Sequence, residues 1–437
     1  MRLTREGSRV RVPARPFTRR HARRPPLNAL DLAYLLVAGA TAPWWARKAR
    51  GGWRERFARD LPPPRGDASR PRVLVHAVSV GEVNAVREFV PLLAERAEVV
   101  VAASTDTGIA RARELFADRH LVVRYPLDAS GAVRRFLDAV RPDAVALVEL
   151  ELWPNFVREC VGRGIPIGVV NGRLSDRSFR GYRRIRPFIG ASFRALAFAC
   201  VQDETYAERF RAMGTPPERV HVTGSMKFDS ARVGEPEGAG ALARELGIDR
   251  ARPLIVAGST GPGEEALLRS ACERAFHGEH VQLLCAPRKP ERFDEAAAAL
   301  PGCVRRSQPG ARTETPPRWY LLDTIGELRS AYALADLVVV GRSFFDLYGS
   351  DPLEPAALGK PVLIGQRVDD FRSVVETLDH AGAIVRTDRA RVSADLAALL
   401  NDAERRAELG RRALACVEAN RGASRRNAGL VAEAVGV

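Results

Sequence analysis

The chain has 437 residues, of which 46% are hydrophobic and 28% are charged, a composition that excludes a disordered or fibrous protein and allows two or three globular domains. Its formal net charge is +15, and residues 1–24 contribute +8 of it, since nine arginines there face one glutamate. No nucleic-acid-binding motif accompanies this basic tail, which therefore favours an anionic membrane surface over nucleic acid. A start codon placed too far upstream is the alternative explanation of the tail.

Residues 28–50 hold the one membrane candidate, an apolar run at 29–46. The run is shorter than the ~20 residues that a transmembrane helix needs, and it contains Asp31. Trp44 and Trp45, with cations directly after them, are typical of a helix that lies in the membrane interface. We therefore expect a monotopic anchor helix, with a single full span and a buried amphipathic helix as the alternatives.

Short apolar runs alternate with helical patterns from residue 72 onward. Their unbroken apolar character predicts parallel strands that are buried on both faces beneath helices. In the first half of the chain the predicted strands are 72–78, 98–104, 121–127, 144–150, 165–171, 196–202 and 219–224.

The stretch 231–241 is rich in Gly, Pro and Glu, which predicts a linker. After it, short apolar runs again alternate with helical patterns. Two such halves predict an α/β fold with two doubly wound, Rossmann-like domains, whose ligand would bind in a cleft beyond the carboxyl ends of the strands. The predicted strands of the second half are 254–259, 281–287, 336–341, 361–365 and 383–387, followed by a closing helix pair. The expected parts are a basic tail (1–27), an anchor helix (28–50), a first domain (51–230), the linker and a second domain (242–437).

Several function classes lose support because their motifs are missing. No GxGxxG, GxxxxGK[ST] or GxSxG sequence stands at a strand-to-helix turn, which argues against a dinucleotide-dependent dehydrogenase, a P-loop NTPase and an α/β-hydrolase. The six cysteines and seven histidines show no metal-ligand spacing, so we expect the cysteines to be buried free thiols.

Unusual carboxylates follow two of the predicted strands. The first strand runs into HAVSVGE, a strand-to-helix turn that ends in Glu82, although a structural turn there requires only a glycine and a cap. The fourth runs into ELELWPN, where Glu149 and Glu151 share one side if the strand continues that far. Carboxylates at a buried strand end are costly unless they are paired or exposed in a cleft, so salt bridges to arginines remain the alternative to a functional role.

Polar turns follow the strands of the second half as well. The sequence GSTGPGEE opens a helix, and its free N–H groups around Ser259 and Thr260 predict an anion site, with an ordinary helix cap as the alternative. The basic turn APRKPERF (286–293) suits a phosphate, although solvated cations are common. Glu354, in the first turn of a helix, either favours the helix dipole or accepts hydrogen bonds from ribose hydroxyls. Lys227, in TGSMKFD, is in isolation best explained as a surface lysine.

Seven motifs together resemble, in order and spacing, the lipid A Kdo (3-deoxy-D-manno-octulosonic acid) transferases, and the resemblance spans residues 28–425. They are HAVSVGE, ELELWPN, NGRLSDRS, TGSMKFD, PRKPERF, DTIGEL and DPLEPAALGKPVLIG. The resemblance implies a GT-B fold and an inverting, metal-independent transfer of Kdo from CMP-Kdo to a lipid A precursor (lipid IVA) in lipopolysaccharide biosynthesis. It also implies action at the cytoplasmic face of the inner membrane, with CMP-Kdo, the lipid and an anionic membrane surface as partners and no cofactor besides the donor.

The resemblance assigns roles residue by residue. Glu82 matches the family's general base, and Glu149 and Lys227 match residues that stabilise the transition state. The CMP contacts carry over to Pro287, Arg288, Ile325, Gly326, Glu327, Asp351, Pro352, Leu353 and Glu354. A helix N-terminus would lower the pKa of Glu82, whereas a water-poor cleft or the neighbouring Glu149 would raise it.

The nucleotide half departs from the family's pattern at several positions. Gly261 stands where the family has a histidine, Arg342 replaces a glycine, and Tyr348, Ser350 and Asp351 replace a glycine, a histidine and an asparagine. Arg342 is a candidate to supply the positive charge that the missing histidines leave behind. These changes keep three alternatives open: a GT-B transferase with another donor, a sugar-nucleotide epimerase on the same fold, and a non-catalytic relative.

Overall fold

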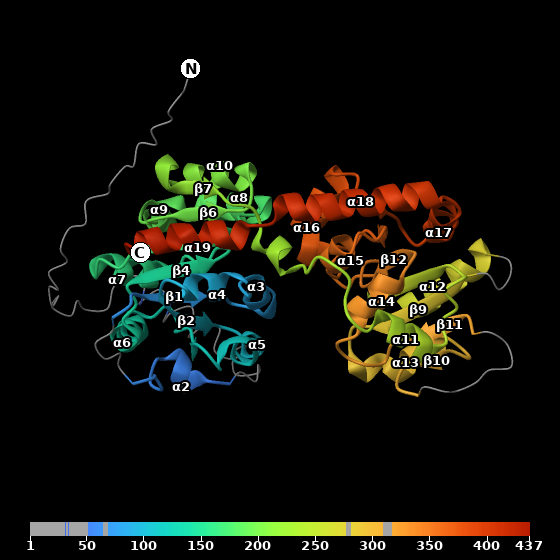
Figure 1. Ribbon diagram of the computed structural model, residues 1–437. Helices are drawn as coiled ribbons and strands as arrows, with labels where there is room; N and C mark the ends of the chain where they lie inside the picture. The colour runs from blue at the N-terminus through green and yellow to red at the C-terminus, as the bar shows by residue number, and fades with distance from the viewer. Residues whose placement is uncertain (1–30, 32–33, 35–50, 64–68, 277–280, 309–316) are drawn as a thin grey trace, which may run out of the picture. The chain divides into compact units, whose positions relative to one another are not determined.

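The computed structural model describes Asp31, Tyr34 and residues 51–63, 69–276, 281–308 and 317–437 (Figure 1). The chain divides into two compact units: a first unit of Met1–Gly224 with Ser424–Val437, and a second unit of Ser225–Ala423. Each unit contains one seven-stranded sheet covered by helices. The expected α/β class with two parallel-sheet domains is confirmed.

The first sheet has the strand order β3-β2-β1-β4-β5-β6-β7, and every neighbouring pair is parallel. All residues of β1 and β4 are buried, which explains why these strands read as unbroken apolar runs. The strands are β1 (Arg72–His76), β2 (Glu98–Ala103), β3 (Leu121–Arg124), β4 (Ala144–Val148), β5 (Ile167–Gly172), β6 (Ala199–Val201) and β7 (Val220–Val222).

The helices of the first unit follow its strands in alternation, and side-chain caps start several of them. Thr105 accepts a hydrogen bond from the Gly108 N–H at the start of α5, and Asp203 accepts one from Tyr206 at the start of α10. The helices are α2 (Trp53–Arg56), α3 (Val80–Ala85), α4 (Phe89–Ala94), α5 (Asp106–Phe116), α6 (Ser130–Val140), α7 (Pro154–Gly162), α8 (Asp176–Arg184), α9 (Arg186–Arg194), α10 (Glu204–Met213) and the 3₁₀ turn η1 (Pro217–Arg219).

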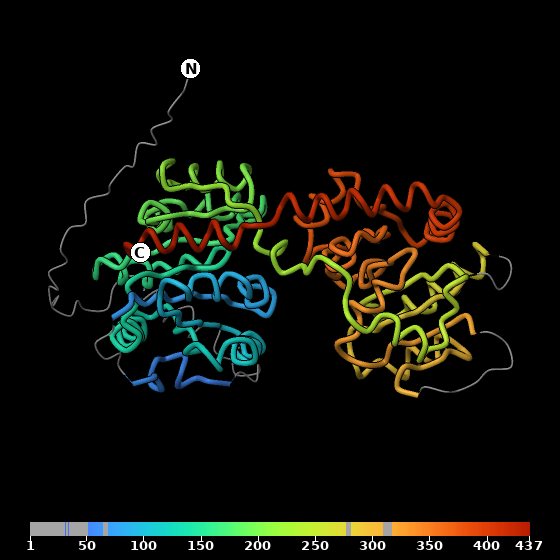
Figure 2. The backbone as a smooth tube through the Cα atoms, in the orientation of Figure 1, coloured from blue at the N-terminus to red at the C-terminus, as the bar shows by residue number. Residues whose placement is uncertain are grey.

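The last helix, α19 (Ala423–Ala434), returns to the first unit (Figure 2). Its buried Asn427 accepts a hydrogen bond from the Asn171 N–H (3.2 Å) and donates one to the Thr223 hydroxyl (3.0 Å). The sequence placed both closing helices with the second domain, so this is a difference from the expected division. The polar anchor at Asn427 is the physical reason, because it pairs groups at the ends of β5 and β7.

The second sheet has the order β10-β11-β9-β8-β12-β13-β14 and is likewise parallel. Two of its strands, β10 with two residues and β11 with three, were not predicted. The strands are β8 (Leu254–Thr260), β9 (Gln282–Pro287), β10 (Val304–Arg305), β11 (Trp319–Leu321), β12 (Leu337–Val340), β13 (Val362–Ile364) and β14 (Ile384–Arg386).

Hydrophobic clusters around Val338 and Val339 contain alternate residues of β8 and β12, so helices cover both faces of the second sheet. The helical segments are η2 (Met226–Ser230), α11 (Ala239–Leu246), α12 (Glu264–Ala275), η3 (Pro290–Arg292), α13 (Phe293–Ala299), α14 (Leu328–Leu334), α15 (Leu353–Ala357), η4 (Asp369–Phe371), α16 (Arg372–His380), α17 (Val392–Asn401) and α18 (Ala403–Asn420).

Each sheet reverses its strand order at one point, between β1 and β4 in the first unit and between β8 and β12 in the second. In doubly wound sheets ligands bind beyond the carboxyl ends of the strands at such a switch point. The residues that follow β1, β4, β8 and β12 are therefore the first place to look for a site.

The predicted anchor helix lies outside the described residues except for Asp31 and Tyr34. The buried Asp31 carboxylate accepts hydrogen bonds from the Ser130 N–H (2.9 Å) and the Asn155 amide (3.1 Å), and the Tyr34 hydroxyl donates to Asp128 (3.0 Å). Within the described part of the chain, no helix combines the length and the apolar character that crossing a membrane requires.

Candidate functional site

Glu82 lies in the first turn of α3, directly beyond the carboxyl end of β1. Its carboxylate accepts hydrogen bonds from the Val78 N–H (2.9 Å) and the Ser79 hydroxyl (3.1 Å). Ser79 is the N-cap of α3, so Glu82 reaches back across the helix start much as the glutamate of a capping box does. Glu82 thus also stabilises the turn itself, a structural role that the sequence analysis did not predict. Its carboxylate lies half-buried at the switch point.

Two further carboxylates surround Glu82. Burial and the negative charge of Glu149 raise the pKa of Glu82 to about 7, against the opposing hydrogen bond from Val78. Burial also raises the pKa of Glu151, although the Trp153 indole donates a hydrogen bond to it (2.8 Å). The sequence analysis expected the helix N-terminus to lower the pKa of Glu82 and a water-poor cleft or Glu149 to raise it; the effects that raise the pKa are larger.

Glu149 follows β4 with a positive φ of 59°, a conformation that breaks the pleat directly after Val148. The expected strand alternation of Glu149 and Glu151 therefore does not exist, although both carboxylates act electrostatically on Glu82. Within the described residues, no arginine or lysine forms an ion pair with any of the three. The salt-bridge explanation of these glutamates is thus not supported.

Two neighbours of this carboxylate group escaped the sequence analysis. His76 is fully buried at the end of β1 and stacks on Tyr125 at a centroid distance of 3.5 Å, and burial lowers its pKa to about 3, so it stays neutral. Arg173 follows β5, and its backbone N–H donates to the Glu149 carbonyl (3.4 Å). The Arg173 Nε is buried without a partner among the described residues. Its position after a strand end, within NGRLSDRS, was the available signal.

Lys227 lies in η2 and belongs to the second unit, because the division falls after Gly224 instead of after residue 230. Its ammonium group lies 5.7 Å from the centre of the Phe371 ring. Burial raises the pKa of Asp351, and the hydrogen bond from the Leu353 N–H and the positive charge of Lys227 oppose that rise. The structure therefore places Lys227 beside Asp351, a residue expected to contact the nucleotide.

The expected nucleotide residues gather at the carboxyl edge of the second sheet. The end of β8 carries Ser259 and Thr260, and the end of β9 carries Pro287, which Arg288 follows. The loop after β11 carries Ile325, Gly326 and Glu327. The turn into α15 is formed by Asp351, Pro352, Leu353 and Glu354. Burial raises the pKa of Glu354, with Asp351 adding to the rise, while Arg329, Arg288 and Arg232 oppose it. Ile325 is 73% exposed, so this edge carries an apolar side chain free to contact a ligand.

One N–H group of the turn expected to bind an anion is engaged by the protein itself. The buried Glu264 carboxylate accepts hydrogen bonds from the N–H groups of Gly261 (2.9 Å), Arg342 (2.6 Å), Ser343 (2.9 Å) and Phe344 (3.1 Å). The Thr260 hydroxyl donates to Glu265 (2.6 Å). Glu264 therefore engages the Gly261 N–H of this turn from within the protein. Binding of an anion by the other N–H groups of the turn, around Ser259 and Thr260, stays a prediction.

The basic turn after β9 is also partly engaged. Arg292 forms ion pairs with Glu265 (3.1 Å) and Glu295 (2.8 Å), whereas Arg288 is exposed and its positive charge acts on Glu354. Arg288 is thus an exposed cation of this turn without an ion pair among the described residues, whereas the exposed Lys289 beside it lies 4.0 Å from Glu291. No group of three His, Cys, Asp or Glu side chains suited to a metal ion occurs in the described ranges.

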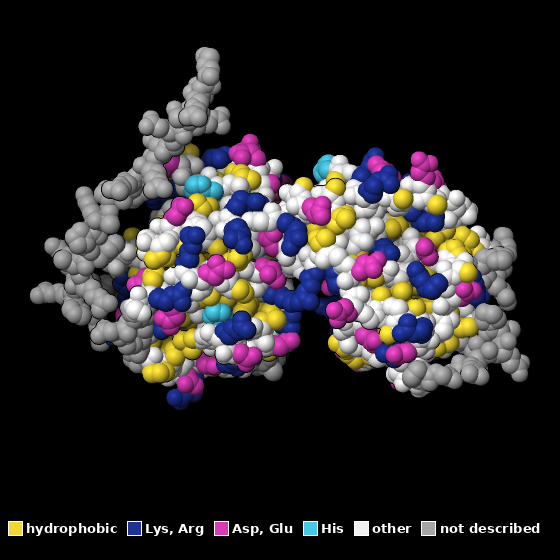
Figure 3. Space-filling model, viewed as in Figure 1, with side chains coloured by type: hydrophobic (Ala, Val, Ile, Leu, Met, Phe, Trp, Pro, Cys, Tyr) yellow, Lys and Arg dark blue, Asp and Glu magenta, His cyan; other side chains and the backbone are white. Residues whose placement is uncertain are grey.

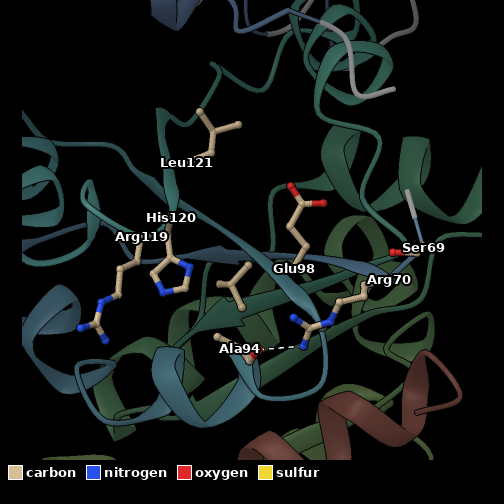
Figure 4. Close-up of a pocket in the computed structure, with 9 residues that line it drawn as sticks. Ser69, Arg70, Ala94, Glu98, Arg119, His120 and Leu121 are labelled. Atoms are coloured by element: carbon tan, nitrogen blue, oxygen red, sulfur yellow. Dashed lines mark hydrogen bonds between the residues drawn. The ribbon is translucent and has the colours of Figure 1, made fainter. Parts of the chain in front are cut away.

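A pocket of about 520 Å³ lies elsewhere in the first unit (Figure 4). Glu98 and Leu121, the first residues of β2 and β3, line it together with Arg70, Arg119 and His120. It therefore opens at the amino ends of the strands, away from the edge that carries Glu82. No residue expected from the sequence to act in the site lines this pocket.

Comparison with known proteins agrees with the two-domain architecture. Residues 51–230 match the family described as 3-deoxy-D-manno-octulosonic-acid transferase (kdotransferase). A glycosyltransferase structure from Rickettsia africae is 12% identical, with a TM-score of 0.54, and covers 84% of this chain and all (100%) of its own, which supports the fold alone.

Two curated relatives carry the family assignment. The 3-deoxy-D-manno-octulosonic acid transferase of Bordetella pertussis is 33% identical over 87% of this chain and 92% of its own length. The transferase of the same name from Haemophilus influenzae is 31% identical over 84% of this chain and 86% of its own. The chain therefore belongs to the 3-deoxy-D-manno-octulosonic acid (Kdo) transferase family and is a glycosyltransferase.

Proposed function

We propose that this enzyme transfers Kdo from CMP-Kdo to a lipid A precursor, lipid IVA, with inversion at the anomeric carbon and without a metal ion. The observation that carries the proposal is the half-buried Glu82 carboxylate at the switch point of the first unit, whose pKa is raised to about 7. A carboxylate with such a pKa accepts a proton near neutral pH far better than an ordinary glutamate does.

Glu82 acts as the general base in this mechanism. It accepts the proton of the acceptor hydroxyl while that oxygen bonds to the anomeric carbon of Kdo, and the bond from this carbon to the phosphate oxygen of CMP breaks. CMP departs with the electron pair of that bond. Because one displacement on one face inverts the carbon, no second nucleophile is needed, and Glu149 and Glu151 have no covalent role.

The second unit offers the charges that the leaving phosphate requires. Lys227 and Arg288 are cations at its carboxyl edge, and neither forms an ion pair among the described residues. Fixed cations aimed at developing negative charge are the principal means by which phosphate departure is stabilised when no metal takes part. Glu354 and Asp351 accept hydrogen bonds from the donor's hydroxyl groups in this arrangement.

A membrane surface at the cytoplasmic face of the inner membrane is the proposed location, since the acceptor is a phosphorylated lipid. The supporting feature is the junction of α8 and α9, where Phe188 is 77% and Ile185 is 47% exposed. Arg183, Arg184 and Arg186 are exposed around them. Apolar side chains ringed by arginines suit the boundary of an anionic bilayer. Elsewhere basic and acidic side chains are interspersed over the visible face (Figure 3).

Incubation with CMP-Kdo and tetraacylated lipid A precursor, read by mass spectrometry, tests the proposal. Wild-type protein should add Kdo to the lipid, and Glu82→Gln should abolish transfer while it leaves CMP binding and the fold intact. Glu95→Gln, an exposed glutamate at the end of α4, is the matched control and should retain wild-type turnover. Turnover with a UDP-sugar but none with CMP-Kdo, or substantial turnover by Glu82→Gln, would reject it.

A further inference from the structure

Backbone strain in the second unit is concentrated at its switch point. Among the described residues of this unit, the non-glycine residues with positive φ are Ser259 (54°), Arg342 (57°) and Tyr348 (67°). Ser259 lies at the end of β8, and Arg342 and Tyr348 lie in the loop after β12. Such conformations cost on the order of 1 kcal/mol or more each and persist mainly where a site requires them.

Arg342 is held in this conformation by its own backbone. Its N–H donates to the buried Glu264 carboxylate (2.6 Å), and its carbonyl accepts a hydrogen bond from the Gly349 N–H (2.9 Å). The preceding residue, Gly341, pairs with Gly258 of β8 (2.8 Å). The starting point of the Arg342 side chain is therefore fixed relative to the ends of β8 and β12.

The stem of the Arg342 side chain runs over Gly261. A Cβ atom at position 261 would lie 3.2 Å from the Arg342 Cγ and 2.4 Å from the Leu347 Cδ1. Any side chain at 261 would therefore collide with this loop, and the glycine leaves the room that Arg342 and Leu347 occupy. This places Arg342 against the turn between β8 and α12, at the centre of the expected donor edge.

The guanidinium of Arg342 has no hydrogen bond or ion pair to another described residue, although the side chain is half-buried. The acidic side chains nearest in the chain to this turn are already engaged, because Glu264 holds four N–H groups and Glu265 pairs with Arg292. A half-buried guanidinium at a switch point, without an ion pair among the described residues, is therefore suited to bind an anion of a ligand.

The strand order separates Arg342 from the other donor-side cation. β9 and β12 flank β8, so the strand ends that precede Arg288 and Arg342 are about 10 Å apart, two strand spacings. One cation thus lies on each side of the β8 end. A donor with two anionic groups, a phosphodiester and a sugar carboxylate, could therefore bind one group at Arg288 and the other at Arg342.

We infer that Arg342 binds the carboxylate of the donor's sugar and thereby selects an acidic sugar nucleotide, an inference that rests on the proposed function. The planar guanidinium fork matches a carboxylate through two parallel hydrogen bonds, which a lysine cannot reproduce. The phosphate remains with Arg288 and Lys227. Arg342 is accordingly a specificity-determining residue of the donor site.

Kinetics with two nucleotides distinguish the carboxylate from the phosphate. Arg342→Asn removes the charge, and Asn tolerates positive φ, so the loop should keep its conformation. The KM for CMP-Kdo should rise on the order of 10- to 100-fold, whereas the inhibition constant of CMP, which carries no sugar carboxylate, should change by less than about twofold. Arg342→Lys should fall between Asn and wild type.

Arg367→Gln is the matched control, because it also removes one positive charge. Arg367 is exposed and pairs with Asp346, which lies in the same loop as Arg342. It should leave both constants unchanged, and thermal unfolding should show that all variants fold. An equal rise in the inhibition constant of CMP would assign Arg342 to the phosphate, and unchanged constants would remove it from the donor site; either result overturns the inference. Absence of wild-type turnover with CMP-Kdo contradicts the proposed function itself, and the inference with it.

Discussion

Glu82 and Glu149 follow neighbouring strands of the first sheet, and the negative charge of Glu149 helps to raise the pKa of Glu82 to about 7. Burial is the larger cause of this rise. The two carboxylates have no ion-paired arginine or lysine in the described part of the chain. A glutamate kept basic by burial and by a second carboxylate is a physical arrangement for proton abstraction, and it makes the rate depend on pH in a way that can be measured.

The acidic limb of the pH–rate profile should report Glu82. We expect kcat/KM to rise through about pH 7 and then level off, because only the ionised carboxylate accepts a proton. Glu149→Gln removes one of the charges that raise the pKa, so the limb should move to lower pH even though the rate falls. Profiles from about pH 5 to pH 9 for both proteins, with Glu88→Gln as an exposed control, test this. A limb that stays in place or moves upward in Glu149→Gln would contradict the assignment.

The same raised pKa determines how Glu82 affects stability. Its contribution to the folded state is fully present below the ordinary value of 4.5 and is lost as the pH rises through about 7, because the folded protein then holds a half-buried charge. Glu82→Gln should therefore melt at a higher temperature than wild type at about pH 8, with no advantage below about pH 4.5. This difference separates loss of a base from loss of the fold.

Chelation should leave the reaction unchanged. The proposed mechanism neutralises the leaving phosphate with Lys227 and Arg288, so treatment with EDTA followed by assay in metal-free buffer should retain the untreated rate. Lys227→Gln should instead lower kcat on the order of 100-fold or more, and Lys289→Gln, at an exposed position beside Arg288, should not. Loss of activity on chelation that returns with added magnesium would show that a metal carries part of this role.

Pattern reasoning predicted where most strands lie, because buried strands of a doubly wound sheet are unbroken apolar runs. However, β1, β3 and β4 end two to three residues earlier than predicted. Glu82, Glu149 and the residues after β8 and β9 were located in this way. It failed for β11 (Trp319–Leu321), which directly follows the polar, proline-containing stretch TETPPR (313–318). It also could not show that Lys227 lies in the second unit, or that Glu264 binds the N–H groups of Arg342, Ser343 and Phe344, since both depend on contacts between distant parts of the chain.

Glu264 should be essential to the loop that presents Arg342. Glu264→Ala removes the acceptor of four N–H groups, three of them buried and costly to leave unpaired, and we expect the free energy of unfolding to fall by about 3–5 kcal/mol. Glu273→Ala, which removes an exposed pair with Arg269 from the same helix, should cost less than about 1 kcal/mol. Urea unfolding of the two variants provides the comparison, and equal losses would refute the structural role of Glu264.

The docking of α19 should stabilise the first unit and not the second. Asn427→Ala removes the acceptor of the Asn171 N–H and the donor to Thr223, so hydrogen exchange should accelerate in β5 and β7 while β12 and β13 keep their protection. We expect a loss of about 2–3 kcal/mol, as for other buried polar groups left without partners. Asn420→Ala, at the end of α18, is the control, since among the described residues the Asn420 amide bonds only to Cys416 of the same helix. Faster exchange in the second unit alone would show that the chain end supports that unit instead.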